Sequence, residues 1–449
     1  MTQNKQTLLD EKQTPEGYKK TEFGNIPADW SVLCLGELGK FKNGINKDAN
    51  QFGFGKPFVN LMDVFGKISI DKTVSFELIN STELDRKEYS LNRGDVLFIR
   101  SSVKPSGVGL TAVITDNLLE TVFSGFLIRF RSDGNLLDLG FKKYCFNANY
   151  FRKQVISNST VSANTNINQE VLKKLELIFP KKLEEQQKIA TALSDIDTLI
   201  SELEKLIEKK QAIKTATMQQ LLTGKTRLPE FALREDGTPK GYKDSELGQI
   251  PEDWEIYPLR SLLKSQPKYG INAAATALLG NLPTYIRITD INEDGKFSPT
   301  EKVGVNSPLS ENYILERGDI VLARTGASVG KSYLYDEDDG ELIYAGFLIK
   351  ISPASNLLCS KYLSLYFQTK EYWDWIATNS MRSGQPGING NQYANLKIAL
   401  PAINEQLKIS RIFIDIDKEL EKLKIKLNKV SLLKQGMMQE LLTGKTRLV

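Results

Sequence analysis

The sequence contains no histidine among its 449 residues, and this absence excludes more chemistry than any other feature of the composition. Histidine is the commonest side chain for proton transfer near neutral pH and a frequent ligand of zinc and iron. Ser-His-Asp and Cys-His nucleophiles and all His-ligated metal centres are therefore excluded. Cysteine is also scarce, and because the residues lie far apart without CxxC spacing, we expect reduced thiols at Cys34, Cys145 and Cys359.

Other absences narrow the function further. The chain has no Pro-Pro pair, which an Asn/Asp-Pro-Pro-aromatic methyltransferase motif needs, and no Pro-Asp pair, which a PD-(D/E)xK nuclease needs. No stretch approaches the roughly 18 apolar residues of a membrane span, so we expect a cytoplasmic protein without a membrane partner. The net charge of +4, from 59 basic and 55 acidic residues, excludes a polycation. A local basic face would still suffice for DNA binding.

The largest signal that is present is an internal repeat. A period near 220 residues is too long for a solenoid and long enough for a whole domain with an additional element. The sequence therefore predicts one module in two copies. The matched strings, first copy before second, are GNIPADW at 24 and GQIPEDW at 248, LNRGDVLF at 91 and LERGDIVL at 315, GFLIRF at 125 and GFLIKI at 346, and LLTGKTRL at 221 and 441.

The pattern within each copy changes at a proline, Pro180 in the first and Pro401 in the second. Before it, short segments rich in β-branched and aromatic residues indicate strands and turns with some helix. After it, apolar residues recur at three- and four-residue spacing, which predicts two long amphipathic helices that pack antiparallel and end at a left-handed glycine. Packing of each helix on its own domain alone is the alternative. The expected packing positions are Leu193, Ile196, Ile200, Leu203, Ile207, Ile409, Ile412, Ile416, Leu420, Leu423, Leu427 and Val430.

These patterns predict an α+β fold. Two tandem mixed α/β domains are separated by two long antiparallel, coiled-coil-like helices and related by an internal pseudo-two-fold duplication. The predicted divisions are a flexible tail over 1–16, a first domain over 17–180, a first helix over 181–224, a turn-rich linker over 225–244, a second domain over 245–400 and a second helix over 401–445.

Three strings resemble functional motifs without meeting their requirements. TGASVGKS at 325–332 has Thr325 where a P-loop needs glycine, so we reject nucleotide binding by this chain. The Arg-Gly-Asp triplets at 93 and 317 precede strand-like runs, which favours a turn. The acidic run 336–339 is interpreted as a solvated loop. We find no catalytic or metal constellation.

Polar loops with isolated basic residues recur at matched positions in the two copies. Arg suits guanine and Asn or Gln suits adenine in the major groove, and such loops also contact phosphates. A single loop of this kind is more often merely solvated, but the pairing across the repeat favours DNA binding. The candidates in the first copy are Lys42, Asn43, Asn46, Arg100, Ser101, Ser102, Lys104, Ser159, Thr160, Ser162, Asn164 and Asn166. Those in the second are Lys268, Tyr269, Asn272, Arg287, Arg324, Thr325, Ser328, Lys331, Arg382, Ser383, Gln385, Asn389 and Asn391.

The combination of strings resembles the DNA specificity subunit of type I restriction-modification systems. The resemblance runs from about Gly17 to Leu448 and is carried by IPADW and IPEDW, RGDVLFIRSS and RGDIVLARTG, RITDI at 287, SGQPGIN at 383, and PKKLEEQQKI and PAINEQLKI before helices that close with LLTGKTRL. It implies two target recognition domains that each read one half of a split DNA sequence. It also implies two helices that act as a ruler and dock the modification subunits.

The resemblance further implies a division of labour with partner proteins. Two methyltransferase subunits would bring S-adenosylmethionine and methylate adenine. Restriction subunits would bring ATP and Mg²⁺ for translocation and cleavage. This chain would bind double-stranded DNA and neither bind these cofactors nor catalyse a reaction.

The two copies differ in their contact loops. Asn164 to Asn166 stand where the second copy has Gln385, Pro386 and Gly387, so the first loop departs from the family pattern. Identical loops related by a two-fold would read an inverted repeat. Because these loops differ, we expect two different half-sites around an unread spacer. The alternatives are the specificity subunit of a type IIB-like enzyme, a coiled-coil scaffold that binds proteins, and a self-sufficient enzyme.

Overall fold

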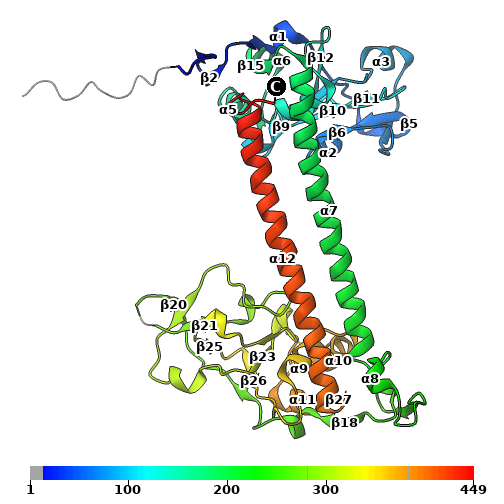
Figure 1. The fold of residues 1–449 in the computed structure, drawn as a ribbon, viewed down its shortest axis with the longest axis vertical. Coiled ribbons are helices and arrows are strands. Elements are labelled where there is room, and N and C mark those ends of the chain that lie inside the picture. Colours follow the sequence, from blue (N-terminus) through cyan, green and yellow to red (C-terminus); the bar gives the residue numbers. More distant parts are fainter. Residues whose placement is uncertain (1–13, 281, 382–384, 449) are drawn as a thin grey trace, which may run out of the picture. The chain divides into compact units, whose positions relative to one another are not determined.

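The computed structural model describes residues 14–280, 282–381 and 385–448. The predicted tail and the candidates Arg382 and Ser383 therefore lie wholly or largely outside the described residues. The chain divides into two compact units, of which the first contains residues 1–204 and 425–449 and the second residues 205–424. Figure 1 gives the element labels. The two long helices, α7 (Leu183–Leu221) and α12 (Ile403–Leu441), each contribute one part to each unit.

The first unit is built on a five-stranded sheet. Its strands, in spatial order, are β4 (Gly39–Asn43), β12 (Leu127–Ser132), β8 (Val96–Ile99), β10 (Thr111–Ile114) and β6 (Ser69–Ile70). Smaller sheets contain β1 (Tyr18–Thr21) with β2 (Gly24–Pro27), β3 (Trp30–Cys34) with β15 (Glu176–Pro180), and β11 (Val122–Phe123) with β5 (Phe52–Val59) and β7 (Glu77–Ile79). The short helices are α1 (Leu35–Leu38), α2 (Leu61–Val64), α3 (Glu83–Glu88), α4 (Leu139–Cys145), α5 (Asn149–Ser157) and α6 (Gln169–Lys174).

The second unit repeats this plan. Its main sheet runs β19 (Lys268–Tyr269), β26 (Leu348–Ile351), β23 (Ile320–Ala323) and β24 (Ser332–Leu334). A second sheet runs β20 (Ala275–Ala277), β22 (Val303–Val305), β21 (Thr284–Ile286) and β25 (Leu342–Tyr344), and two pairs join β16 (Tyr242–Ser245) to β17 (Gly248–Pro251) and β18 (Glu255–Pro258) to β27 (Lys397–Leu400). The helices are α8 (Pro229–Ala232), α9 (Ser360–Tyr366), α10 (Lys370–Ser380) and α11 (Gly390–Ala394). The order β19-β26-β23-β24 reproduces β4-β12-β8-β10, which confirms the duplication.

The central strands are buried on both faces. In β8 all four residues are buried, and because side chains alternate along a strand, Val96 and Phe98 face one apolar cluster while Leu97 and Ile99 face another. In the second unit, Ile320 of β23 likewise belongs to one cluster and its neighbours to the next. Continuous apolar runs such as VLFI and IVLA are thus explained by two-sided burial.

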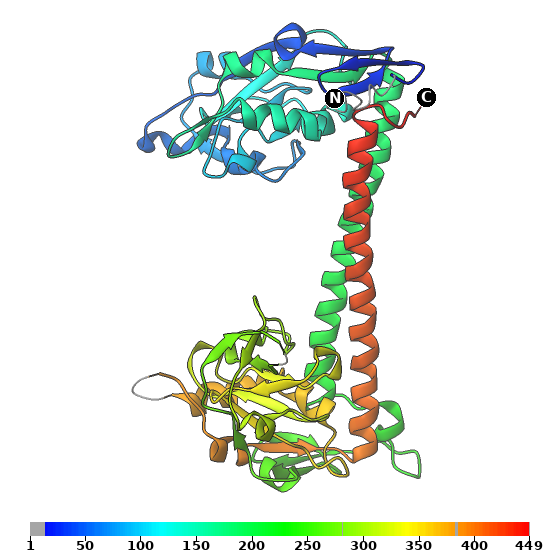
Figure 2. The same ribbon diagram turned by 90° about the vertical axis from the view of Figure 1, so that its left-hand side faces the viewer.

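The long helices pack antiparallel, as the sequence predicts. In the first unit Asp197 pairs with Lys434 at 2.5 Å, and in the second Lys210 pairs with Glu419 at 2.8 Å. Residue numbers that rise along one helix and fall along the other define the antiparallel direction, and α7 and α12 lie side by side in both views (Figures 1 and 2). The predicted packing residues are buried or half-buried along both helices. Each helix also packs on its own domain, since Leu193 and Ile409 belong to the domain cores, so both alternatives hold together.

The repeated Thr-Gly-Lys-Thr-Arg-Leu segment follows each long helix. Gly224 and Gly444 have φ angles of +73° and +70°, which confirms the predicted left-handed glycines. Sterics give a second reason for glycine, because an added Cβ would lie 2.6 Å from Pro251 at the first position and 2.4 Å from Pro27 at the second. The segment is therefore pressed against the IPxDW string in each unit.

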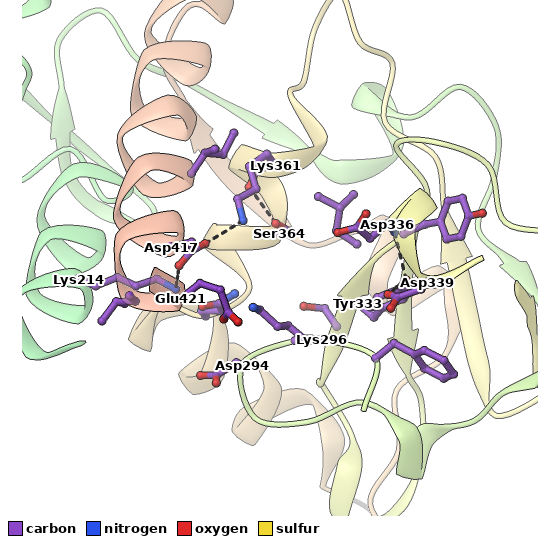
Figure 3. Close-up of a pocket in the computed structure, with 18 of the residues that line it drawn as sticks. Lys214, Asp294, Lys296, Tyr333, Asp336, Asp339, Lys361, Ser364, Asp417 and Glu421 are labelled. Atoms are coloured by element: carbon purple, nitrogen blue, oxygen red, sulfur yellow. Dashed lines mark hydrogen bonds and ion pairs between the residues drawn. The ribbon is translucent and has the colours of Figure 1, made fainter. Parts of the chain in front are cut away.

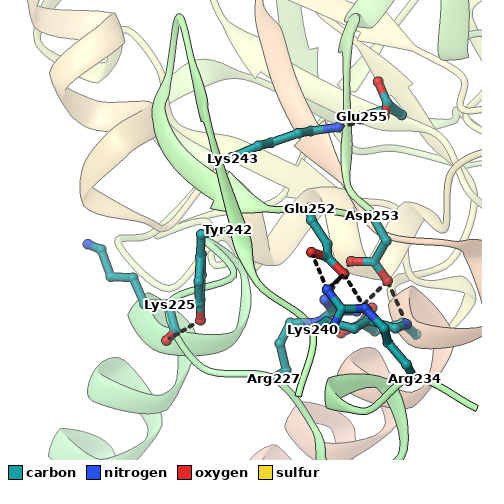
Figure 4. Close-up of polar contacts among 10 residues, drawn as sticks. Lys225, Arg227, Arg234, Lys240, Tyr242, Lys243, Glu252, Asp253 and Glu255 are labelled. Carbon is teal, nitrogen blue, oxygen red and sulfur yellow. Dashed lines mark hydrogen bonds and ion pairs between the residues drawn. The ribbon is translucent and has the colours of Figure 1, made fainter. Parts of the chain in front are cut away.

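An arginine completes this docking in each unit. Arg227 donates to Asp253 at 2.7 Å (Figure 4). It also donates to Glu405 at 2.7 Å, and its guanidinium lies 5.7 Å from the Trp254 ring centroid. In the first unit Arg447 makes the matched contacts with Glu185, Asp29 and Trp30. The sequence LLTGKTRL thus recurs because each copy attaches the end of a long helix to the IPxDW string of one unit.

We predict that Arg227→Ala strongly destabilises the second unit. Its side chain is 7 % exposed and that of Glu405 only 2 %, so the variant leaves a buried carboxylate unpaired. Removing one partner of a buried pair typically costs about 3 to 5 kcal/mol of unfolding free energy. The control is Arg234→Ala, whose pair with Glu252 is solvent-exposed and is expected to contribute less than about 1 kcal/mol (Figure 4). Urea unfolding measures both, and equal small losses would contradict the role of Arg227.

The same cluster predicts a pH dependence. Burial raises the pKa of Asp253, but hydrogen bonds from Arg227 and Lys240 outweigh it and lower the pKa to about 2. Since an unfolded Asp titrates near pH 3.9, this carboxylate stabilises the fold above that pH and loses its contribution as the pH falls toward 2. The difference in urea stability between the wild type and Asp253→Asn should be constant above about pH 5 and shrink toward pH 3. A gap that widens in acid would contradict this sign.

The predicted linker is held to the second unit. Arg234 pairs with Glu252, Lys240 with Asp253, and the Tyr242 hydroxyl donates to the Lys225 carbonyl at 3.1 Å (Figure 4). The Arg-Gly-Asp triplets form turns, as predicted, with φ of +94° at Gly94 and +92° at Gly318. Within the described ranges, no helix is long and apolar enough to cross a membrane.

Candidate nucleic-acid interface

In the first unit, two predicted loops are joined by backbone pairing. Strand β9 (Ser101–Ser102) pairs antiparallel with β14 (Thr165–Asn166), which also pairs with β13 (Thr160–Val161). The Ile167 amide extends this ladder by donating to the Arg100 carbonyl at 3.0 Å. The strings RSSVK and NTN, predicted as separate loops, thus form one three-stranded surface.

The second unit joins the matched loops in the same register. The Ile388 amide donates to the Arg324 carbonyl at 2.9 Å, and the Gly326 amide donates to the Pro386 carbonyl at 3.0 Å. Gln385 lies against this turn, because a Cβ on Gly326 would be 2.9 Å from its side-chain nitrogen. Both units therefore present one arginine at the point where two polar loops meet.

The third predicted loop reaches the same place. In the second unit the Arg324 guanidinium lies 5.0 Å from the ring centroid of Tyr269, whose hydroxyl accepts a hydrogen bond from the Gly390 amide at 3.0 Å. Arg324 Nε is buried without a hydrogen-bond partner among the described residues. In the first unit Asn43 occupies the place of Tyr269 in the matched string, so the first surface has an amide side chain where the second has a phenol.

Buried groups fix the backbone beneath Arg324. The Tyr393 hydroxyl donates to the Ala323 carbonyl at 3.0 Å. Burial raises the pKa of Tyr393 well above its ordinary value, so this phenol stays protonated and keeps donating. In the first unit Arg152 holds the neighbouring loop by donating to the carbonyls of Ser106 and Val108 at 3.0 and 2.7 Å. The contact loops are thus supported by the domain core.

Several candidate cations already have carboxylate partners. Lys42 pairs with Glu88, Lys331 pairs with Glu293 at 2.7 Å, and Arg287 pairs with Asp290 at 2.8 Å. The Arg287 contact closes a local turn, because Asp290 also accepts from the Arg287 amide. These three side chains would have to exchange a carboxylate for phosphate to bind DNA, which makes them weaker candidates than Arg100 and Arg324.

The remaining candidates take local structural roles or stay exposed. Asn389 caps α11 by accepting from the Gln392 amide at 2.9 Å, which leaves its amide nitrogen for a base contact. Ser159 donates to the Val155 carbonyl at 2.6 Å. Thr325 forms an isolated antiparallel β-bridge with Gly387. Lys331 donates its backbone amide to the Ser328 carbonyl. The exposed candidates are Asn46, Lys104, Thr160, Ser162, Asn164, Lys268, Tyr269, Asn272, Gln385, Asn389 and Asn391.

Sequence reasoning missed two phenylalanines at this surface. Phe126 and Phe347 are 58 % and 57 % exposed, and their carbonyls accept from the Arg100 and Arg324 amides at 2.8 and 3.1 Å. Both belong to the repeated GFLI string, which in the sequence serves only as a sign of the duplication. The Ser-Gly pair that precedes Phe126 was the available signal, since Ser-Gly marks turns.

A hollow of about 440 Å³ lies elsewhere in the second unit, beside the long helices (Figure 3). Asp417 of α12 pairs there with Lys214 of α7 at 2.6 Å and with Lys361 of α9 at 3.3 Å. Burial raises the pKa of Asp417, but the hydrogen bond and charge of Lys214 lower it on balance. Because these charges satisfy one another, we interpret the cluster as a brace between the helices and the domain. Over the described ranges, no group of acidic or cysteine side chains is placed to hold a metal ion.

Comparison with known proteins identifies the family. A model described as the type I restriction modification DNA specificity domain matches residues 27–215 and 251–430. The chain is 26% identical over 450 residues to the type I restriction enzyme MjaX specificity subunit of Methanocaldococcus jannaschii, covering 96% of this chain and 97% of that protein. It is 23% identical over 459 residues to the MjaVIII specificity subunit of the same organism, covering 96% of each.

A solved structure shares the fold. A chain from work on complex assembly and conformational transition of the type I R-M system superposes with a TM-score of 0.60 at 15% identity, covering 94% of this chain and 99% of that one. The doubled family match agrees with the two copies found in the sequence and in the sheet order. The chain belongs to the type I restriction-modification DNA specificity family and contains its domain twice.

Proposed function

We propose that this chain is the specificity subunit of a type I restriction-modification complex and reads an asymmetric, bipartite DNA target. The observation that carries the proposal is a single recognition surface built twice with different side chains. The backbone register around Arg100 matches that around Arg324. The second surface adds Tyr269 and Gln385, whereas the first has Asn43 and Asn164 in the matched strings. Two such surfaces would read two different half-sites.

The long helices are proposed to set the unread spacer between the half-sites and to carry the modification subunits. Each helix has 39 residues, which at about 1.5 Å per residue corresponds to about 58 Å. The ion pairs along both helices hold them in one register, which a ruler requires.

The chemistry is proposed to belong to partner proteins. Two methyltransferase subunits would bring S-adenosylmethionine and methylate adenines in the target, and restriction subunits would bring ATP and Mg²⁺ for translocation and cleavage. This chain would bind none of these cofactors and catalyse neither reaction. We expect it to act in the cytoplasm, where these partners meet DNA.

Coexpression with the cognate modification subunits, followed by sequencing of methylated adenines, tests the proposal. We expect one bipartite motif with two unlike halves and a spacer of constant length. Cleavage on both sides of that motif by the complete complex would identify a type IIB-like enzyme instead. Methylation or cleavage by the purified chain alone would indicate a self-sufficient enzyme. Absence of any motif, with an intact complex, would favour a protein-binding scaffold.

A further inference from the structure

An exposed phenylalanine occupies the tip of a tight turn in each unit. The Leu127 amide donates to the Ser124 carbonyl at 2.8 Å, and the Leu348 amide donates to the Ala345 carbonyl at 2.8 Å. Phe126 and Phe347 are therefore the third residues of matched four-residue turns. Single exposed apolar side chains are common on proteins, but these two lie at matched turn tips that are bonded to the arginine loops of the candidate interface.

The turn is fixed by the three loops that form the candidate interface. A Cβ on Gly125 would lie 1.9 Å from Asn46 Oδ1, so the first loop packs directly on the turn. In the second unit a Cβ on Gly346 would lie 3.2 Å from the Ile271 carbonyl, in the equivalent loop. The hydrogen bonds from the Arg100 and Arg324 amides to the phenylalanine carbonyls tie the turn to the second loop. The backbone of each phenylalanine is thus bonded directly to that of the arginine of its surface.

We propose that Phe126 and Phe347 each pack against the apolar surface of a base in the half-site that their own unit reads. This inference rests on the proposed function and adds a specificity-determining contact to it. The arginines supply charge and hydrogen bonds, whereas a thymine methyl group or an unstacked base face needs an apolar partner. A phenylalanine supplies this contact in either case. Its place next to Arg100 or Arg324 puts the apolar contact at a base adjacent to the one the arginine reads.

The test measures binding of the complex, formed by the full chain and its modification subunits, to DNA duplexes. One duplex contains the bipartite motif found by the coexpression experiment, and the others each carry one substituted half-site position. Phe126→Ala is expected to weaken binding about tenfold or more and to flatten discrimination at one position of one half-site. Phe347→Ala should do the same in the other half-site only. Because no charge is removed, the slope of log affinity against log salt should stay unchanged.

Matched controls come from Leu136 and Leu357, which are 49 % and 46 % exposed and lie at equivalent positions next to the long helices. Their backbone carbonyls accept hydrogen bonds from the side-chain nitrogens of Gln186 and Gln406, on the long helices, at 2.8 and 3.1 Å. Leu136→Ala and Leu357→Ala should leave the base profile at wild-type values. Unfolding measurements should show all four variants folded, since each removes an exposed group.

Three outcomes would overturn the inference. One is a wild-type base profile in both phenylalanine variants. Another is an equal loss of affinity for every sequence. The third is failure of Phe126→Ala or Phe347→Ala to assemble with the modification subunits, which would show that the rings contact protein. Each is distinguishable from failure of the proposed function, in which the wild-type complex itself yields no bipartite motif.

Discussion

Inserting seven residues into both long helices, after Glu204 and after Lys424, is expected to lengthen the unread spacer by about three base pairs. Seven residues add about 10.5 Å to a helix, and base pairs are spaced by about 3.4 Å. Seven residues are also close to two full turns, so the apolar stripe stays in phase. The insertion points lie between the pair Asp197–Lys434 and the pair Lys210–Glu419, so both contacts are preserved. Methylation profiling of the variant gives the spacer directly.

The control is the same insertion in one helix only. It shifts one side of the antiparallel pairing past the other and should abolish methylation or leave it without a constant spacer. Each half-site should have the same sequence in the double insertion as in the wild type, because the recognition surfaces are untouched. An unchanged spacer in a double-insertion variant that folds and supports methylation would contradict the proposal that the helices set the spacer.

Replacing Arg324 with alanine is expected to relax one half-site and spare the other. Arg324 stands where two loops meet, stacks on Tyr269 and has no carboxylate partner among the described residues. If it reads a guanine edge, its loss costs about 1 to 3 kcal/mol, or roughly fivefold to more than a hundredfold in affinity for that half-site. Methylation profiling should show degeneracy at one position of one half.

Two further variants distinguish base reading from a general loss of DNA binding. Arg100→Ala should relax the opposite half-site, because Arg100 holds the equivalent backbone position in the first unit. Lys268→Ala removes an exposed ammonium from β19 and, as a phosphate contact, should lower affinity for all sequences and reduce the salt slope by about one. Equal, sequence-independent losses in all three variants would contradict base reading by the arginines.

The sequence predicted the large-scale organisation because that information is repetitive. The strings IPADW and LLTGKTRL recur in order, and heptad spacing from Leu193 onward is visible without tertiary contacts. The antiparallel direction also followed, since a helix with an apolar stripe needs a partner and its own repeat was available. The structure confirms these points through the sheet order and the ion pairs between the helices.

The composition of the site was harder to predict, because it depends on which loops converge. Residues 100–104 and 164–166 are far apart in sequence and become one surface only through the β9–β14 pairing. The pair Arg287–Asp290 is only three residues apart and was visible in the sequence, but nothing local marks Lys331 as paired with Glu293. Arg324, by contrast, has no carboxylate partner among the described residues. Phe126 was missed because an apolar residue next to a buried strand is normally assigned to the core.

The methylation motif of a chain that carries the second recognition domain twice tests the central claim most directly. In this variant residues 31–179, between Trp30 and Pro180, are replaced by residues 255–400, which lie between Trp254 and Pro401. Both long helices and the ion pairs of Arg227 and Arg447 remain. Reading of one half-site by each unit predicts an inverted repeat of a single half-site around the wild-type spacer. A motif that keeps two unlike halves, from a complex that assembles and methylates, would contradict the account.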